Sequence, residues 1–241
     1  MSELEIHQLL RRYTLAQTAP GRFWLCLDVA MRQLAWNCMW HGPQVFKRGV
    51  DVTLSLLALV MLGPLFALVY LLIKWEDGGP VLFTQTRVGQ FGSEFPLYKF
   101  RSMCMDAEKR LQEVLALNQH KEGITFKLKH DPRITRVGKW LRKFSIDEFP
   151  QFFNVLIGDM SLVGPRPPVP REVAKYSQAD RRRLAVKPGL TCIWQISGRA
   201  NIDFSGQVQL DVRYIESQSF WTDVKILAQT VPAVVSGKGA C

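Results

Sequence analysis

Two adjacent carboxylates, Asp147 and Glu148, are the residues of this chain whose types and spacing most clearly suit chemistry. Glu148 stands three residues after Ser145, the spacing of a capping box, so the sequence predicts a helix that begins here and ends near Gly158. The backbone dipole at a helix N-terminus favours negative charge, and a Pro-rich loop then returns with one arginine, Arg166. The alternative is structural: Glu148 caps the helix and Asp147 complements its dipole.

Carboxylates beside an arginine suit chemistry on a phosphate group. An ionised Asp can attack phosphorus and form an acyl phosphate, and a neighbouring Glu can hold Mg²⁺, which prefers oxygen ligands and substrate phosphates. An arginine can bind phosphate oxygens through two parallel hydrogen bonds. Asp147, Glu148 and Arg166 fit this chemistry, although their spacing alone leaves the capping role open.

The segment before the carboxylates is basic and amphipathic. Its apolar residues recur at helical spacing: Ile134, Val137, Leu141 and Phe144. This pattern predicts a helix at a membrane surface, whose C-terminal end brings Arg142 to five residues before Asp147. Farther upstream, Val81–Val88 and Glu94–Phe100 are β-prone runs around a glycine-containing turn, which predicts a hairpin. Lys99 lies at its end and could meet a phosphate, a lipid headgroup or solvent.

The longest apolar run, from Val50 to Ile73, is the strongest signal for a membrane segment. An unbroken helix of this length is sufficient to span a hydrocarbon core of about 30 Å. Gly63 and Pro64 lie near its middle, and a proline removes one backbone donor and disfavours helix at the preceding residue. The sequence therefore predicts a break at Gly63 and Pro64.

Basic residues flank this run on both sides, with Lys47 and Arg48 before it and Lys74 after it. Because basic residues mark the cytoplasmic side of a membrane, both ends are expected on that side. This favours a re-entrant helix–break–helix that enters and leaves one leaflet, with a kinked spanning helix as the alternative. Asp51, just inside the boundary, is expected to form an ion pair with Lys47 or Arg48 at the surface.

Residues 1–45 form an N-terminal extension. Its segment 22–40 contains tryptophans but is too polar to cross a bilayer, so it fits a helix in the headgroup region or a soluble helix packed on the rest of the protein.

The chain has 31 basic and 21 acidic residues, which indicates an anionic partner such as nucleic acid, a membrane surface or a nucleotide. Five widely spaced cysteines without a Cys-x-x-Cys motif argue against a disulfide framework or a zinc site and for a reducing compartment.

From about Phe46 to its C-terminus, the chain resembles the bacterial sugar transferases that are monotopic phosphoglycosyl transferases. The matching motifs, in order, are residues 47–51, the apolar run broken at Pro64, and residues 98–103, 145–148, 158–167, 187–191 and 194–199. Cys192 departs from the family pattern, in which glycine is more usual at this position. This departure puts only fine substrate preference in doubt.

The resemblance implies transfer of a sugar 1-phosphate from a nucleoside diphosphate sugar, expected to be a UDP-hexose, to a polyprenol phosphate such as undecaprenyl phosphate. It implies a covalent aspartyl-phosphosugar intermediate and a role in the first membrane step of exopolysaccharide or other glycan assembly. The expected cofactor is Mg²⁺, and the expected location is the cytoplasmic face of the bacterial inner membrane. Membrane lipid is an expected partner, and a homodimer is left open.

The family's Asp-Glu dyad matches two residues of this chain. It implies Asp147 as the nucleophile and Glu148 as a Mg²⁺ ligand. Substrate phosphate is expected to be bound by four cations: Arg142 and Arg166, which match the family's arginines, and Lys99 and Arg199. Because nearby cations favour the charged form of a carboxyl group, Asp147 is expected to stay ionised at neutral pH.

These observations predict a mostly helical α+β fold in three parts. They are an N-terminal extension (1–45), a re-entrant membrane helix (46–76) and a cytoplasmic catalytic domain (77–241) with interfacial amphipathic helices and a small β-hairpin.

A membrane-surface binding module would explain the charge, but it gives no reason for adjacent carboxylates near a proline-flanked arginine. A nucleic-acid partner is not expected, because the sequence has no recognised binding motif and the apolar run fits that function poorly.

Overall fold

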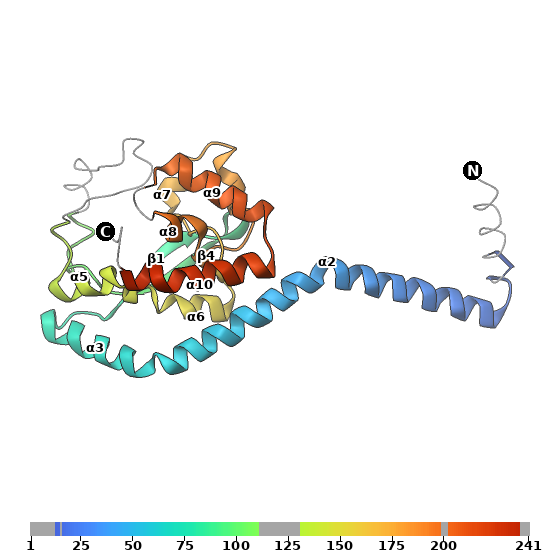
Figure 1. Cartoon of the computed structure of the whole chain (residues 1–241), viewed down its shortest axis with the longest axis horizontal. Helices are drawn as coiled ribbons and strands as arrows, with labels where there is room; N and C mark the ends of the chain where they lie inside the picture. Colours follow the sequence, from blue (N-terminus) through green and yellow to red (C-terminus); the bar gives the residue numbers. More distant parts are fainter. Residues whose placement is uncertain (1–12, 15, 111–130, 199–201, 237–241) are drawn as a thin grey trace. The chain divides into compact units, whose positions relative to one another are not determined.

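The computed structural model describes residues 13–14, 16–110, 131–198 and 202–236, with the backbone alone given for 34–35 and 37–41 (Figure 1). The chain divides into two units, Met1–Gly49 and Val50–Cys241. The described part is mostly helical and contains two small two-stranded sheets, in agreement with the predicted α+β class. The candidate site lies within the second unit.

The apolar run folds as two helices with a break between them. Helix α2 (Ala19–Met61) begins in the first unit and ends in the second, and α3 (Gly63–Asp77) follows after Leu62. The segments Gly42–Met61 and Gly63–Asp77 are bent by 57° at this point, so the predicted break is confirmed. Pro64 lies in the first turn of α3, where a missing backbone N–H costs little.

Among the described residues, the bent pair is the part that could enter a bilayer by length and composition. Within the described residues, no single helix is both long and apolar enough to cross, whereas the two bent segments together meet that criterion by length and composition. Many of their large apolar side chains are exposed: Leu54, Leu56, Leu57, Val60, Met61, Leu68, Leu71 and Trp75. Whether the pair re-enters one leaflet or spans the bilayer stays a prediction.

The predicted hairpin is confirmed. Strand β1 (Leu82–Val88) pairs antiparallel with β2 (Glu94–Phe100), and a 3-10 turn, η1 (Gln90–Gly92), lies between them. Phe91 (φ 56°) and Gly92 (φ 86°) both have left-handed backbones. Glycine adopts this conformation without steric cost, which explains the glycine in the turn.

The register of the hairpin decides which side chains share a face. Phe83 lies opposite Lys99, and Arg87 lies opposite Phe95. Directly opposed residues lie on the same face of a sheet, as do residues two apart along one strand. Phe83, Gln85, Arg87 and Lys99 therefore lie on one face of the hairpin.

The hairpin packs against a core built largely from α6 (Gln151–Ile157), β3 (Ser161–Val163), α9 (Phe204–Glu216) and α10 (Phe220–Ser236). Its buried members are Phe95, Leu97, Val155, Met160, Leu162, Val163, Tyr214 and Ile226.

Strand β3 also pairs in parallel with β4 (Gly189–Thr191), which the sequence does not predict. The described part of the unit also includes the short helices α7 (Pro170–Val173), η3 (Asp180–Leu184) and α8 (Ile193–Ser197). Helix α6 ends at Gly158 in a left-handed conformation (φ 105°), as predicted.

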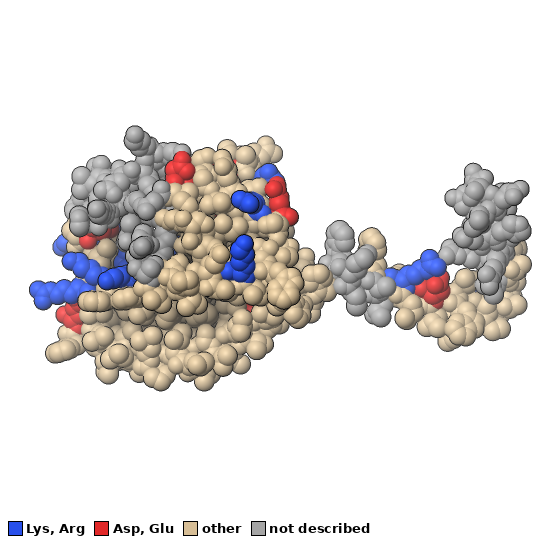
Figure 2. Space-filling view, in the orientation of Figure 1, with Lys and Arg blue, Asp and Glu red and all other residues tan. Residues whose placement is uncertain are grey.

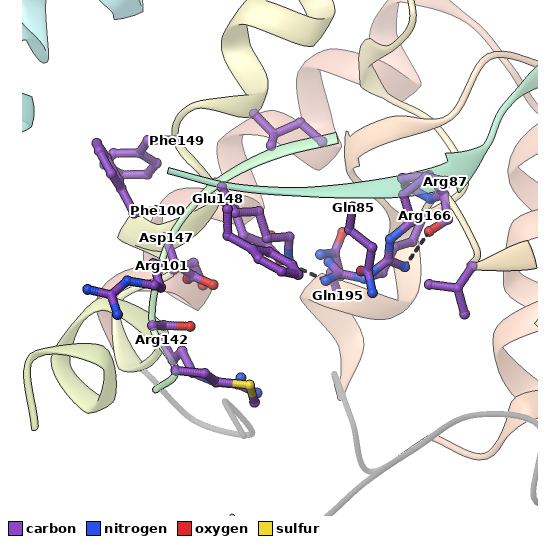
Figure 3. Close-up of a pocket in the computed structure, with 18 of the residues that line it drawn as sticks. Gln85, Arg87, Phe100, Arg101, Arg142, Asp147, Glu148, Phe149, Arg166 and Gln195 are labelled. Carbon is purple, nitrogen blue, oxygen red and sulfur yellow. Dashed lines mark hydrogen bonds and ion pairs between the residues drawn. The ribbon is translucent and has the colours of Figure 1, made fainter. Parts of the chain in front are cut away.

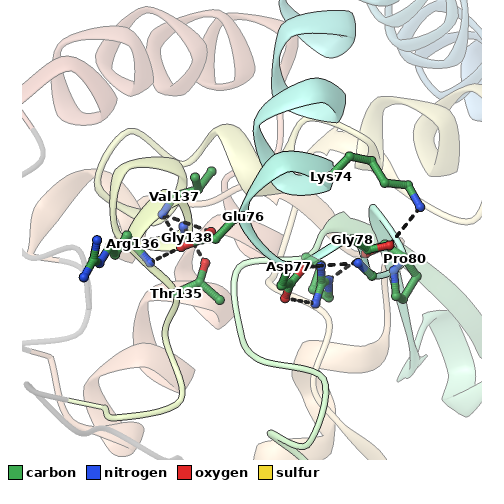
Figure 4. Close-up of polar contacts among 11 residues, drawn as sticks. Lys74, Glu76, Asp77, Gly78, Pro80, Thr135, Arg136, Val137 and Gly138 are labelled. Atoms are coloured by element: carbon green, nitrogen blue, oxygen red, sulfur yellow. Dashed lines mark hydrogen bonds and ion pairs between the residues drawn. The ribbon is translucent and has the colours of Figure 1, made fainter.

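A second, smaller core joins α3 to β2 and to α5 (Arg136–Lys143), through Val69, Ile73, Phe100 and Leu141. Two acidic residues at the end of α3 add polar contacts (Figure 4). Oε1 of Glu76 accepts a hydrogen bond from the backbone N–H of Arg136 at 2.7 Å and so caps the N-terminus of α5. Asp77 forms an ion pair with Arg101, just after β2, in which Nη1 lies 2.6 Å from Oδ2. Helix α3 is therefore tied to both α5 and the end of the hairpin.

Candidate active site

Asp147 and Glu148 lie in a 3-10 turn, η2 (Ile146–Glu148), rather than at the start of an α-helix. Ser145 has a left-handed backbone (φ 55°) and its side chain caps nothing in the described part of the chain, so the predicted capping box is wrong. Its backbone N–H instead donates to the carbonyl oxygen of Arg142 at 3.1 Å. Ser145 therefore belongs to the end of α5, and the carboxylates are carried by the turn that follows.

A cavity of about 740 Å³ opens beside this turn (Figure 3). Five of the predicted site residues line it: Lys99, Arg142, Asp147, Glu148 and Arg166. Among the described residues that line it, eight are Arg or Lys and four are Asp or Glu. This excess of positive charge makes the cavity suitable for an anionic ligand.

Glu148 is the carboxylate on which the cations of the cavity converge. Its Oε1 accepts from Nη2 of Arg166 at 2.7 Å and from Nζ of Lys99 at 3.0 Å. Burial alone would raise the pKa of Glu148, but the charges of Arg166 and Lys99 outweigh burial and hold that pKa well below its usual range. Glu148 is therefore ionised throughout the physiological pH range.

The pKa of Asp147, which directly precedes Glu148, is shifted in the opposite direction. Its side chain is buried, and burial raises its pKa above the ordinary value of an aspartate. The charge of Lys99 lowers the same pKa and the charge of Glu148 raises it. The net direction is opposite to the one expected from the sequence, because desolvation outweighs the nearby cations. An ionised Asp147 here is a carboxylate with little solvation, which suits a nucleophile.

Arg166 is held by a loop that is fixed through its backbone. The loop follows β3, and the N–H of Gly189 donates to the carbonyl oxygen of Pro165 at 2.8 Å. A Cβ atom on Gly189 would lie only 2.0 Å from the backbone nitrogen of Gly164, so the two segments can approach this closely only with glycine. Pro165 and Pro167 restrict the backbone on either side of Arg166.

Arg142 reaches the cavity from the last turn of α5. The helix begins after Thr135, whose hydroxyl accepts from the N–H of Gly138 at 2.9 Å. A Cβ atom on Gly138 would lie 2.0 Å from the carbonyl oxygen of Ser102, so α5 lies directly against the backbone that follows β2. Together with the Glu76 cap, this contact sets the position of Arg142.

Arg87 is one of the cations of the cavity that were not among the predicted site residues. Arg87, from β1, lines the cavity, and its Nη1 donates to the carbonyl oxygen of Pro167 at 2.9 Å. Figure 3 shows Arg87 beside Arg166. The alternation of side chains along β1, with Phe83, Gln85 and Arg87 on one face, is the signal that could have identified it.

Two other predicted positions have separate outcomes. Arg199 lies outside the described residues, so its predicted phosphate contact stays a prediction. Asp51 is 5% exposed, and its Oδ1 accepts from the backbone N–H of Leu162 at 3.1 Å, a contact that the sequence does not predict. Its predicted ion pair with Lys47 or Arg48 stays a prediction.

The carboxylates of the cavity can be compared with the needs of a metal ion. No group of three or more His, Cys, Asp or Glu side chains in the described part of the chain could hold a metal alone. Asp147 and Glu148 nevertheless line one cavity, and Mg²⁺ is commonly held by one or two carboxylates together with substrate phosphates. The donor set therefore fits a Mg²⁺ ion that shares its coordination with a phosphate ligand.

Comparison with known proteins gives a consistent family. Residues 42–237 match the bacterial sugar transferase family. The galactosyl transferase CpsE of Streptococcus agalactiae serotype III (strain NEM316) is 50% identical over 201 residues, which make up 83% of this chain and 44% of that protein. The undecaprenyl-phosphate galactose phosphotransferase of Salmonella typhimurium (strain LT2) is 42% identical over 217 residues, or 88% of this chain and 45% of that protein.

A third relative is similar in length to this chain. The exopolysaccharide production protein ExoY of Sinorhizobium fredii (strain NBRC 101917 / NGR234) is 41% identical over 199 residues, or 81% of this chain and 88% of that protein. The chain thus spans less than half of the first two relatives and most of the third.

Proposed function

The chain belongs to the bacterial sugar transferase family, and from that we propose that it transfers a sugar 1-phosphate from a nucleoside diphosphate sugar to a polyprenol phosphate. The observation that carries the proposal is the position of Asp147, a buried carboxylate in a basic cavity beside Glu148 and Lys99. The name of the Salmonella relative, undecaprenyl-phosphate galactose phosphotransferase, supports the acceptor class. A UDP-hexose is the donor that we propose.

In the first half of the reaction, a carboxylate oxygen of Asp147 attacks the phosphorus atom that is bonded to the sugar. The bond from this phosphorus to the bridging oxygen breaks, and the nucleoside monophosphate leaves with both electrons of that bond. Arg142, Arg166 and Lys99 offset the negative charge that gathers on the phosphate oxygens. The product of this step is an aspartyl phosphosugar.

In the second half, a phosphate oxygen of the polyprenol phosphate attacks the same phosphorus atom. The bond to Asp147 breaks, the carboxylate is restored, and a polyprenol diphosphate sugar is formed. The nucleotide leaves before the lipid reacts, so the kinetics are ping-pong.

Glu148, with Asp147 beside it, would hold Mg²⁺ together with the substrate phosphates, and the bound ion supplies further positive charge at the phosphate oxygens. The strongly lowered pKa of Glu148 supports this role, because a metal ligand must be ionised at neutral pH. Glu148 also keeps Lys99 and Arg166 at one point of the cavity.

We place this reaction at the cytoplasmic face of the bacterial inner membrane. The bent pair of apolar helices and its exposed leucines support a segment that enters the bilayer. Helix α3 contacts α5 and β2, so a membrane-embedded α3 would hold the cavity near the lipid phosphate. The name of the third relative, an exopolysaccharide production protein, supports a role in the first membrane step of glycan assembly.

The test is capture of the covalent intermediate. The full chain is incubated with donors labelled in the sugar, without lipid acceptor, and the protein is separated and counted. We expect label on the wild type and on Asp180→Asn, a control that removes a carboxylate that does not line the cavity, but none on Asp147→Asn. Label on Asp147→Asn would exclude this nucleophile, and kinetics that require both substrates before nucleotide release would exclude the ping-pong order.

A panel of nucleotide sugars, scored by release of nucleoside monophosphate, identifies the donor. Failure of every donor to release a nucleotide would exclude the transferase. A membrane-bound protein without this activity would return the chain to the class of membrane-surface binding modules.

A further inference from the structure

Arg87 is a half-buried cation in the cavity for which the protein supplies only neutral contacts. Its Nη1 donates to the carbonyl oxygen of Pro167 at 2.9 Å, and its Nη2 donates to Oε1 of Gln85 at 2.7 Å. Its Nε is buried and has no hydrogen-bond partner among the described residues. A guanidinium group has five N–H donors, so Arg87 retains donors that no described group satisfies.

Other buried arginines of the cavity lining form ion pairs with acidic residues. Each has an aspartate partner: Arg101 with Asp77, Arg133 with Asp131, and Arg183 with Asp211. Arg166 is paired with Glu148. In the part of the chain that the structure describes, no Asp or Glu forms an ion pair with Arg87. The missing counter-charge is therefore a local feature of Arg87.

The surroundings of Arg87 disfavour its positive charge. Burial and the neighbouring charge of Arg166 lower the pKa of Arg87 to about 10, and Arg171 acts in the same direction. The carboxylates of Glu172 and Glu148 offset part of this effect. Arg87 is still a cation at neutral pH, so the folded protein keeps an incompletely compensated charge. Such a charge has a free-energy cost in the folded protein, and an anionic ligand in the cavity would offset it.

The position of Arg87 indicates which part of an anion it could bind. Figure 3 shows Asp147 and Arg142 on one side of the cavity and Arg87 with Arg166 on the other, with Glu148 between them. In phosphoryl transfer the attacking and leaving oxygens lie roughly in line on opposite sides of phosphorus. A leaving group displaced by Asp147 must therefore depart toward the side of Arg166 and Arg87.

We propose that Arg87, with Arg166, binds the phosphate that is displaced from the donor, which is the phosphate of the nucleoside monophosphate. This inference rests on the proposed function, because the displaced phosphate exists only if Asp147 attacks a nucleoside diphosphate sugar. When the bond between phosphorus and the bridging oxygen breaks, the electron pair remains on that oxygen. The guanidinium of Arg87 offsets the charge that develops there.

The same subsite serves the second half of the reaction. Asp147 is then the leaving group, so the entering oxygen of the polyprenol phosphate must approach from the opposite side of phosphorus. That side is the one the nucleoside monophosphate has left. The two phosphates therefore occupy one subsite in turn, and the nucleoside monophosphate competes with the lipid acceptor.

A purely structural role for Arg87 makes a different prediction. If Arg87 only anchors the Pro167 carbonyl, its removal should lower the melting temperature of the ligand-free protein. If Arg87 is an uncompensated cation kept for a ligand, a neutral substitute should leave the melting temperature unchanged or raise it. The sign of the change in the ligand-free protein separates these two roles.

The experiment uses the full chain purified in detergent, with uridine 5′-monophosphate and inorganic pyrophosphate as probes. For Arg87→Gln we expect the Kd of both probes, measured by calorimetry, to rise about tenfold or more. We expect the melting temperature without ligand not to fall. Arg213→Gln, which removes one exposed cation outside the cavity lining, should bind both probes as the wild type does.

A second variant tests the anchoring contact directly. Gln85→Leu removes a neutral partner of Arg87 and leaves the cation, so it should retain most of the affinity for both probes. Unchanged affinity in Arg87→Gln would overturn the inference. So would a loss in Gln85→Leu equal to that in Arg87→Gln, or a fall in the melting temperature of ligand-free Arg87→Gln. If the wild type binds neither probe and releases no nucleotide from any donor, the proposed function fails together with this inference.

Discussion

Glu148 and Arg166 form an ion pair that joins two separate segments of the cavity wall, with Nη2 of Arg166 at 2.7 Å from Oε1 of Glu148. Glu148 lies in the turn η2, and Arg166 lies in the loop after β3. Lys99, from the hairpin, contacts the same oxygen at 3.0 Å. Three elements that are distant in the sequence therefore converge on one carboxylate.

Replacing that carboxylate tests its role in catalysis. Glu148→Gln keeps the size of the side chain but removes the charge that pairs with Lys99 and Arg166. We expect nucleotide release to fall by about 100-fold or more and to lose its dependence on Mg²⁺, because the variant loses the proposed metal ligand and leaves two cations without a counter-charge. The measurement is a Mg²⁺ titration of nucleotide release. Glu216→Gln, at an exposed ion pair with Arg182, is the control and should be unaffected.

Normal Mg²⁺-dependent turnover in Glu148→Gln would return this residue to a structural role.

The protonation of Asp147 should set the acid limb of the pH–rate profile. Only the ionised carboxylate can attack phosphorus, so activity falls as the pH falls through the pKa of Asp147. Because burial raises this pKa, the acid limb of kcat/KM should lie above the ordinary range of an aspartate. Lys99→Met removes a charge that lowers the pKa of Asp147, so the limb should move to still higher pH. Lys139→Met, at an exposed position on α5, should not move it.

The same pKa shift has a consequence for stability. A carboxyl group whose pKa is raised in the folded state holds its proton more tightly there than in the unfolded chain. The free energy of unfolding therefore decreases as the pH rises through this range. Asp147→Asn should raise the melting temperature at neutral pH while it abolishes labelling by the donor. A lower melting temperature would mean that the ionised carboxylate stabilises the fold.

Asn154 is a buried clamp between α6 and the hairpin. Its Oδ1 accepts from the N–H of Tyr98 at 3.0 Å, and its Nδ2 donates to the carbonyl oxygen of Pro96 at 2.7 Å. Asn154→Ala leaves both backbone groups without a partner, so the free energy of unfolding should fall by about 2–5 kcal/mol, as measured by denaturant titration. Asn154→Asp keeps the acceptor for Tyr98 but places a carboxylate oxygen against the carbonyl oxygen of Pro96 and near Asp159, so at neutral pH it should lose at least as much. A loss of less than about 1 kcal/mol in Asn154→Ala would exclude this account.

The topology of the bent helices can be tested by labelling. Single cysteines placed before Lys47 and after Lys74 should both react only from the cytoplasmic side if the pair re-enters one leaflet. Reaction from opposite sides would show a spanning helix. Pro64→Ala should move some molecules toward the spanning form. Because Pro64 lies in the first turn of α3, this shift should be smaller than the roughly 3 kcal/mol of a proline inside a helix.

Features with a local cause could be predicted from the sequence. The break at Gly63 and Pro64, the hairpin and the end of α6 at Gly158 each depend on a residue whose backbone preferences act within one or two turns. The family could also be identified, because its motifs follow one another in order over most of the chain. Four cations and two carboxylates were assigned to the site, and the five described residues among them line one cavity.

Features that depend on distant contacts could not be predicted. The parallel pairing of β3 with β4 joins two three-residue strands that are far apart in the chain, and each is too short for a periodic pattern. Ser145 has the spacing of a cap, but the end of α5 determines its conformation. The burial that raises the pKa of Asp147 arises only in the folded chain, where η2 packs against β2 and α5.

The glycine contacts around the site set a limit on how this enzyme family member could be redesigned. Gly138 lies against Ser102, and Gly189 lies against Gly164, with no room for a side chain at either contact. A mutant library aimed at a new sugar donor should keep Gly138, Gly164 and Gly189 unchanged. Its diversity belongs at side chains that line the cavity away from the carboxylates, such as Gln195.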